Sequence, residues 1–122
     1  MGRAMSDQKG VILIIDDDPV FTQVLARAFV RRGYEVQEAH NAAEALLQVE
    51  QCKPQRVTLD LNLGNESGLQ LIKPLLDRMP LLDIVVLTGY SSIATAVEAI
   101  KLGAANYLCK PATADDVLAA FL

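Results

Sequence analysis

The sequence predicts an α/β fold, a doubly wound five-stranded parallel sheet flanked by five helices. Short apolar runs alternate with amphipathic helical stretches five times between Val11 and Leu122, and this alternation is typical of parallel strands joined by right-handed crossovers. The chain has 122 residues, of which 52% are hydrophobic and 21% charged. This length and composition suit one domain with a single core.

The first unit is a strand over Val11–Ile15, because a wholly apolar run is typical of a parallel strand buried on both faces. Asp18 and Pro19 have the residue types of an N-cap and a first helical turn. The helix is expected to run to Arg32 and to end at Gly33. Its predicted core face consists of Phe21, Val24, Leu25, Ala28 and Phe29.

The second strand is predicted over Tyr34–Ala39. Asn41, followed three residues later by Glu44, resembles a capping box, and it opens a helix expected to reach about Gln51. The third strand is predicted over Gln55–Asp60.

A polar loop is expected over residues 61–66, followed by a helix from Ser67 to Arg78. Pro74 lies inside that helix and should kink it or begin a tighter second segment. The fourth strand is predicted over Asp83–Thr88.

Ser91 or Ser92 is the predicted cap of the next helix, which Gly103 ends. Its sheet-facing side chains are expected to be Ile93, Ala96, Val97 and Ile100. The fifth strand is predicted over Ala105–Cys109, and Thr113–Leu122 opens the fifth helix.

Charge and hydropathy narrow the class of protein. The net charge is -4 at pH 7 and no cluster of Lys and Arg stands out, so this segment is not expected to bind nucleic acid. The sequence shows neither an apolar run long enough to span a bilayer nor a signal-peptide pattern, so no membrane association is expected. Cys52 and Cys109 are interpreted as free thiols of a reducing cytoplasm.

Charged and hydroxyl side chains stand where four predicted strands end. Asp16 and Asp17 follow the first strand, Asp60 closes the third, Thr88 closes the fourth and Lys110 follows the fifth. The carboxyl ends of parallel strands share one edge of the sheet, which is where open α/β sheets bind ligands. Carboxylates crowded there repel one another and require a cation, and a hard cation such as Mg²⁺ prefers oxygen ligands. If these acids were ordinary surface charges, they would be expected at both edges of the sheet. Their gathering at one edge indicates a phosphoryl-acceptor site with a metal beside one reactive aspartate.

These positions together resemble the receiver domain of two-component response regulators, over about residues 10 to 122. The matching residues are the acid pair Asp16–Asp17, the acceptor Asp60, the switch Thr88, the aromatic Tyr107 and Lys110–Pro111, with 28 residues from Asp60 to Thr88 (88 − 60) and 22 from Thr88 to Lys110 (110 − 88). The stretch LTGYSSIATAVEAIKLGAANYLCKPATADDVLAAF further resembles the RegA/PrrA/ActR/RoxR group of redox-responsive transcriptional regulators.

The resemblance implies a flavodoxin-like receiver fold and a mechanism. Asp60 would take a phosphoryl group from a phosphohistidine on a sensor histidine kinase. Mg²⁺ would be held by Asp17 and Asp60, by Asp16 directly or through water, and by the backbone carbonyl of Asn62. Lys110 would supply a positive charge to a phosphoryl oxygen, and a cis Lys110–Pro111 bond would aim it into the site.

The implied output is a change of surface. Thr88 would move toward the phosphoryl group and let Tyr107 rotate inward, which alters the surface formed by the fourth helix, fifth strand and fifth helix. This surface would control a DNA-binding output domain outside the chain and would support a phosphorylation-dependent homodimer. The domain would not be an enzyme in the usual sense, but an acceptor that promotes its own phosphorylation and dephosphorylation.

The sequence also divides the chain into two parts, because its first ten residues are polar and contain two methionines. Residues 1–10 are expected to be a disordered or vector-derived N-terminus, and residues 11–122 to be the receiver domain. The final helix ends in the apolar letters AAFL without a stop signal. It is therefore interpreted as a truncated helix of an excised receiver, or as the short last helix of a single-domain protein.

Two positions depart from the family pattern. Gly64 stands where many receivers have proline, so the loop after Asp60 should be more mobile. Tyr90 lies two residues after Thr88, where its ring is expected to shield the phosphoryl group from water. Cys109 is interpreted as a buried small hydrophobe, with a thiol sensor as the alternative.

Other classes fit less well. A flavodoxin-like cofactor binder would need a Gly- and Ser-rich phosphate loop after the first strand, where Asp16, Asp17 and Asp18 would repel phosphate. A haloacid-dehalogenase-type phosphatase would need an aspartate at the position of Asn62 and a cap domain. The remaining alternative is a pseudo-receiver, an interaction module that works without phosphorylation.

Overall fold

The computed structural model describes residues 9–89 and 93–121. Its main sheet has five parallel strands in the order β2-β1-β3-β6-β7, which confirms the predicted doubly wound fold. The strands are β1 (Val11–Ile15), β2 (Glu35–Ala39), β3 (Arg56–Asp60), β6 (Asp83–Thr88) and β7 (Asn106–Cys109). The order along the sheet reverses after β1, so β1 and β3 lie side by side at the topological switch point.

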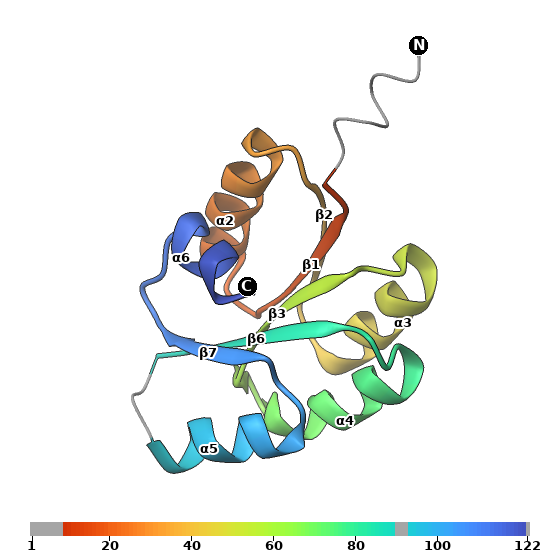
Figure 1. Cartoon of the computed structure of the whole chain (residues 1–122), viewed down its shortest axis with the longest axis vertical. Helices are drawn as coiled ribbons and strands as arrows, with labels where there is room; N and C mark the ends of the chain where they lie inside the picture. Colours follow the sequence, from red (N-terminus) through yellow and green to blue (C-terminus); the bar gives the residue numbers. More distant parts are fainter. Residues whose placement is uncertain (1–8, 90–92, 122) are drawn as a thin grey trace.

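Helices cover both faces of the sheet (Figure 1). They are α2 (Pro19–Arg31), α3 (Ala42–Cys52), α4 (Leu69–Arg78), α5 (Ile93–Leu102) and α6 (Ala114–Ala120). Buried side chains of α2 and α6 form one core cluster with the sheet, whereas those of α3, α4 and α5 form the other. Among the described residues, the model contains no helix with the length and apolarity needed to cross a membrane.

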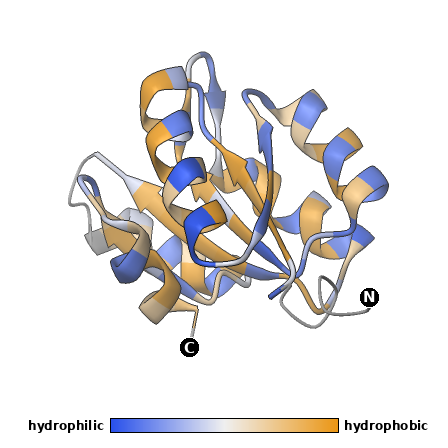
Figure 2. Cartoon of the chain, turned by 90° about the horizontal axis from the view of Figure 1, so that it is seen from above, coloured by the Kyte–Doolittle hydropathy of each residue, from blue (hydrophilic) through white to orange (hydrophobic). Residues whose placement is uncertain are grey.

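The apolar run of β1 serves both core clusters. Ile12 and Ile14 face the cluster of α2 and α6, whereas Leu13 and Ile15 face the opposite cluster, and all four are fully buried. Figure 2 shows the central strands as the hydrophobic middle of the molecule. Burying each such side chain stabilises the fold by about 1.5–3 kcal/mol. This explains why a run without any polar residue forms this strand.

The helix starts follow from side-chain caps. Asp18 Oδ1 accepts hydrogen bonds from the backbone N–H groups of Val20 (3.0 Å) and Phe21 (3.2 Å), which confirms its predicted role as N-cap of α2. At α3, the Asn41 side chain accepts from the Glu44 N–H, as predicted, but Glu44 Oε1 accepts from the N–H of His40 at 2.9 Å. The predicted capping box is therefore only half formed, because Glu44 reaches one residue further back.

Two predicted helix faces are partly wrong. Val24 is 63% exposed on α2, where the buried stripe consists of Thr22, Leu25, Ala26 and Phe29. On α5, Val97 and Ile100 are exposed, whereas the small residues Ala96 and Ala99 are buried. Small side chains let a helix backbone approach the sheet closely, so the larger aliphatic residues of α5 lie beside the contact and face solvent.

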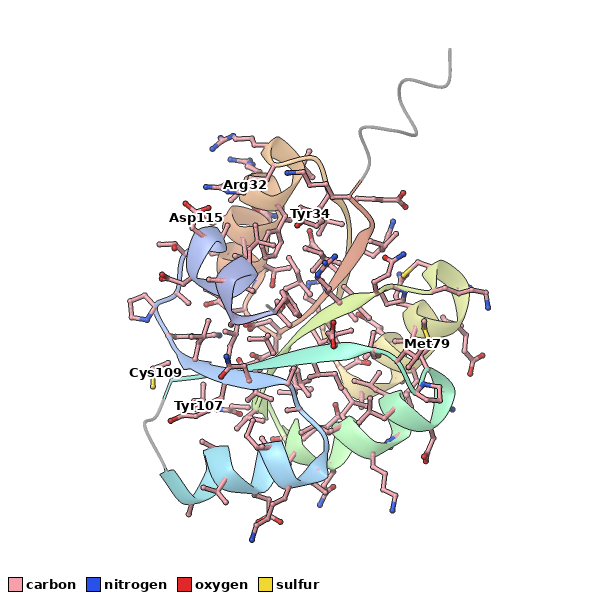
Figure 3. All side chains as sticks on the ribbon, viewed as in Figure 1. Arg32, Tyr34, Met79, Tyr107, Cys109 and Asp115 are labelled. Atoms are coloured by element: carbon pink, nitrogen blue, oxygen red, sulfur yellow. The ribbon has the colours of Figure 1, made fainter. Side chains whose placement is uncertain are left out.

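The predicted burial of Cys109 is also wrong. Strand β7 is the last strand of the sheet, and Cys109 is exposed at its end. Figure 3 shows Cys109 and Tyr107 on the outer side of β7, pointing away from the core. A strand with a neighbour on only one side leaves such residues open to solvent, and an apolar-looking run cannot reveal this.

The segment after Asp60 differs from the predicted loop. It forms a short antiparallel hairpin of β4 (Asn62–Leu63) and β5 (Glu66–Ser67), and α4 begins at Leu69 rather than at Ser67. Helix α4 contains Pro74 and continues to Arg78.

The end of the chain shows two further features. The Lys110–Pro111 peptide bond is cis. Helix α6 covers Ala114–Ala120, so it begins after Thr113, the predicted first residue. The predicted cap at Ser91 or Ser92 and the shielding role of Tyr90 lie outside the described residues.

Candidate functional site

Three carboxylates meet at the carboxyl edge of the central strands. Strands β1 and β3 are paired in register, Ile15 opposite Leu59, so the residues that follow, Asp16 and Asp60, lie side by side. One carboxylate oxygen each from Asp16, Asp17 and Asp60 lies within 4.8 Å of the other two. The edge of the sheet therefore brings together the acids that the sequence singled out.

Lys110 reaches this cluster from the end of β7. Its Nζ lies 2.7 Å from Asp16 Oδ2 and 3.1 Å from Asp60 Oδ2. Its ammonium also lies 4.3 Å from the centroid of the Phe21 ring, within range of a cation–π contact. Because the two carboxylates are almost inaccessible, at 1% and 8% side-chain exposure, this is a largely desolvated ion-pair network.

The electrostatics follow from burial and close charges. Burial raises the pKa of the Asp16 carboxyl, assisted by the nearby charge of Asp60, although hydrogen bonds from Lys110 and from the Asp18 N–H oppose this shift. Burial alone would lower the pKa of the Lys110 ammonium, but its hydrogen bonds to Asp16 and Asp60 outweigh that effect and raise it. Lys110 is therefore held as a cation beside the acids.

Of the remaining predicted residues, Thr88 and Asn62 contact this centre, whereas Tyr107 lies on the outer surface. Thr88 is the last residue of β6, and its carbonyl accepts from the Lys110 N–H at 2.7 Å. The Asn62 N–H donates to Asp60 Oδ1 at 3.0 Å. Tyr107 lies in β7 with 40% of its surface exposed, so the structure places it on the outer face of the domain.

Tyr107 borders a shallow surface pocket of about 220 Å³. The other lining residues come from α5: Ala96, Val97, Ile100 and Lys101. The side chains that contradict the predicted core face of α5, Val97 and Ile100, thus form an apolar surface next to the predicted switch residue.

A glycine that the sequence did not single out packs against Asp60. A Cβ on Gly68 would overlap the Asp60 carbonyl oxygen and would lie 2.8 Å from Leu61 Cα. The Gly68 N–H also donates to the Leu61 carbonyl at 2.9 Å. Only a residue without a side chain fits here, and the sequence gives little signal for it, because Gly68 lies inside the helix that was predicted from Ser67.

The donor set suits a divalent metal ion. Three carboxylates and one ammonium leave the cluster with two negative charges, and carboxylate oxygens are the ligands that Mg²⁺ and Ca²⁺ prefer. Gly64 adopts φ +69°, and a Cβ there would lie 3.5 Å from Asp17 Oδ2. The backbone after Asp60 therefore passes close to the acids without a side chain at that point.

Comparison with known proteins places the whole fold in a family. The model of the "Response regulator receiver domain" matches residues 12–122. The acid tolerance regulatory protein ActR of Sinorhizobium medicae is 47% identical over 111 residues, which are 91% of this chain and 57% of that protein. The photosynthetic apparatus regulatory protein RegA of Rhodovulum sulfidophilum is 44% identical over 111 residues, or 91% of this chain and 61% of that protein. The chain thus spans about three fifths of the length of these relatives.

Solved structures agree with this placement. One is a response regulator protein from Burkholderia pseudomallei, determined with a phosphorylated aspartic acid, a calcium ion and citrate. It superposes with a TM-score of 0.89 at 54% identity, and the match covers 92% of this chain and 66% of the Burkholderia chain. A CheY-like receiver domain protein from Methanospirillum hungatei superposes with a TM-score of 0.84 at 29% identity and covers 89% and 87%.

Proposed function

The chain belongs to the response regulator receiver domain family, and on that premise we propose that Asp60 accepts a phosphoryl group from a sensor histidine kinase in a Mg²⁺-dependent transfer. The observation that supports this most directly is the bridge of Lys110 Nζ between Asp16 and Asp60 within the cluster of three acids. This arrangement places the proposed nucleophile, a positive charge and three possible metal ligands next to one another. A phosphorylated aspartic acid in the Burkholderia pseudomallei relative supports the same chemistry.

In the proposed reaction the Asp60 carboxylate attacks the phosphorus atom of a phosphohistidine. The new O–P bond forms as the P–N bond breaks, and the imidazole nitrogen keeps the electron pair of that bond and takes up a proton. Asp16, Asp17, Asp60 and the Asn62 backbone carbonyl would hold Mg²⁺. The bound ion would neutralise charge on the phosphoryl oxygens, which is the main requirement of such transfers.

Lys110 and Thr88 complete the proposed site. The Lys110 ammonium already lies 3.1 Å from Asp60 Oδ2, so a phosphoryl group on Asp60 would arrive beside a fixed positive charge. The Thr88 hydroxyl would donate a hydrogen bond to another phosphoryl oxygen. With these groups in place, the domain would promote both its own phosphorylation from small donors and its own dephosphorylation.

We further propose that Thr88 and Tyr107 carry the output. Movement of Thr88 toward the phosphoryl group would favour the inward rotamer of Tyr107, which is now 40% exposed beside Val97 and Ile100. This would change the surface formed by α5, β7 and α6. This surface would control a DNA-binding output domain, a role that fits the transcriptional regulatory name of one relative. It would also support a phosphorylation-dependent homodimer.

Acetyl phosphate provides the direct test. Intact-mass measurement after incubation with Mg²⁺ should show one phosphoryl adduct on the wild-type protein, no adduct on Asp60→Asn, and a strongly reduced yield without a divalent cation. Asp77→Asn, which removes an exposed acid from α4, is the matched control and should label normally. If the wild-type protein takes no adduct under any condition, the domain is an interaction module that works without phosphorylation.

A further inference from the structure

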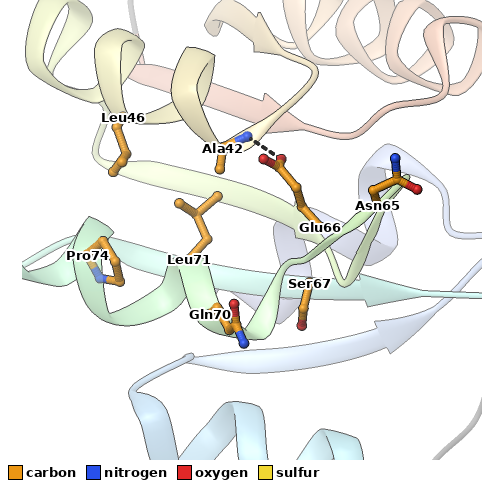
Figure 4. Close-up of a pocket in the computed structure, with 8 residues that line it drawn as sticks. All are labelled: Ala42, Leu46, Asn65, Glu66, Ser67, Gln70, Leu71 and Pro74. Atoms are coloured by element: carbon orange, nitrogen blue, oxygen red, sulfur yellow. Dashed lines mark hydrogen bonds between the residues drawn. The ribbon is translucent and has the colours of Figure 1, made fainter.

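We propose that Glu66 is a positioning residue of the acceptor site, which ties the β4–β5 hairpin to the start of α3. The Ala42 N–H donates to Glu66 Oε1 at 2.9 Å, and Figure 4 shows this bond across the end of the groove between α3 and α4. The inference rests on the proposed function, because it concerns how the Mg²⁺ ligands around Asp60 are held.

The contact satisfies a specific need of α3. The first N–H groups of a helix have no partner inside the helix. The Asn41 side chain accepts a hydrogen bond from the Glu44 N–H, and the Glu44 side chain accepts one from the His40 N–H. The Ala42 N–H instead donates to Glu66. A carboxylate at a helix N-terminus also interacts favourably with the helix dipole, so the charge of Glu66 strengthens the bond.

The hairpin connects this bond to the site. Glu66 pairs with Leu63, which is 4% exposed and belongs to the core cluster. On either side of Leu63, the Asn62 N–H donates to Asp60 Oδ1, and Gly64 passes beside Asp17. Fixing Glu66 therefore fixes the strand that carries Asn62 and Gly64, the backbone closest to the acids.

The hairpin needs such a tether. Each of its strands has only two residues, and isolated hairpins are marginally stable in water. Gly64 adds backbone freedom at the turn. Without the bond from Ala42, we expect the hairpin to sample more conformations, and the proposed ligand carbonyl of Asn62 would then have to be ordered when Mg²⁺ binds, at a cost in affinity.

Two variants remove the bond from opposite sides. Glu66→Ala deletes the acceptor. Ala42→Pro deletes the donor while preserving α3, because proline suits the first helical position and Asn41 before it is extended, at φ −156° and ψ 175°.

Two controls separate this bond from a change of charge. Glu44→Ala removes a carboxylate from the same end of α3, but one that bonds His40 and not the hairpin. Glu66→Gln removes the charge and keeps an oxygen that can accept from Ala42.

The readouts are Mg²⁺ affinity by calorimetry and hydrogen exchange of the Gly68 amide in metal-free protein, since that amide donates to Leu61 at the base of the hairpin. Glu66→Ala and Ala42→Pro should each weaken Mg²⁺ binding about three- to tenfold and speed Gly68 exchange. The double variant should be no weaker than either single one, because both remove the same bond. Glu44→Ala should stay close to wild type, and Glu66→Gln, which keeps the bond without its charge, should lose less than Glu66→Ala.

Wild-type affinity and exchange in both disrupting variants would overturn the inference, as would an equal loss in Glu44→Ala, which would indicate a general charge effect. Unfolding of both variants would make the bond a determinant of folding and would also overturn the positioning role. The proposed function is tested separately by the acetyl phosphate adduct. If the wild-type domain is not labelled but Gly68 exchanges faster in Glu66→Ala, the tether is supported and the phosphoryl-acceptor role is rejected.

Discussion

At Gly68 the chain turns into α4 against the backbone of Asp60, the proposed phosphoryl acceptor. The missing side chain lets the Asp60 carbonyl approach to a distance where any Cβ would overlap it. The sequence predicted Asp16, Asp17, Asp60 and Lys110 because charges at strand ends are conspicuous. Gly68 was not predicted as part of the site, because its backbone conformation is one that any residue adopts, φ −63° and ψ −26°, and its role is visible only in the contact.

Gly68→Ala should therefore be strongly destabilising. The new Cβ would meet backbone atoms of Asp60 and Leu61, which cannot rotate away, so we expect a loss of about 3 kcal/mol in the free energy of unfolding. Gly89→Ala is the matched control, because a Cβ at Gly89 would meet no atom of the described residues within 4 Å. Urea unfolding of the two variants checks this, and equal stabilities would contradict it.

Among the helices, α6 depends most on its ends. It covers only seven residues, a length at which an isolated helix does not form in water. Val117 and Ala114 dock it on the sheet. Its start is a complete capping box, in which Thr113 Oγ1 accepts from the Asp116 N–H and Asp116 accepts from the Thr113 N–H, each at 3.1 Å.

Thr113→Ala should cost about 1 kcal/mol of unfolding free energy, since it leaves one helix N–H without its partner. The exposed Arg32–Asp115 pair, which joins α2 and α6 in Figure 3, is a useful contrast at 2.9 Å. Asp115→Asn should leave the stability close to wild type, because water screens a pair at the surface. Thermal unfolding monitored by circular dichroism compares both variants, and a larger loss in Asp115→Asn would reverse the ranking.

The elements show what could be predicted from the sequence and what could not. The bounds of β1 and β6 were predicted correctly, because fully buried parallel strands need continuous apolar runs between polar ends. The β4–β5 hairpin was missed because its strands are too short to show a pattern. The faces of α2 and α5 were partly wrong because aliphatic residues surround more of each helix than the sheet covers, and burial then depends on tertiary packing.

For the molecule as a whole, the buried Asp16 carboxylate opposes folding in the absence of a metal ion. Burial and the charge of Asp60 raise the pKa of Asp16 above 3.8. Between pH 3.8 and the folded pKa, Asp16 therefore binds more proton in the folded state than in the unfolded state. The stability of metal-free protein falls as the pH rises through this interval. A divalent ion that binds only the folded state reverses this loss by mass action.

Asp16→Asn should remove this dependence. In metal-free buffer at pH 7 the variant should be more stable than wild type, and the difference should shrink as the pH is lowered toward 4. Mg²⁺ at 100 times the dissociation constant of the wild type should add about 2.7 kcal/mol to the unfolding free energy of the wild type. The same Mg²⁺ concentration should add clearly less to that of Asp16→Asn. Urea unfolding between pH 4 and pH 7, with and without Mg²⁺, measures both effects. The explanation fails if wild-type stability rises relative to the variant over this pH interval.

The bridge made by Lys110 has a consequence for biosynthesis. Its two carboxylate partners lie 94 and 50 residues earlier in the chain. Asp16 and Asp60 leave the ribosome well before the lysine that joins them, so a nascent chain carries the proposed nucleophile without its partner cation. If the proposed function holds, the domain could accept a phosphoryl group only once its last strand is in place, and incomplete or unfolded copies would not take part in signalling.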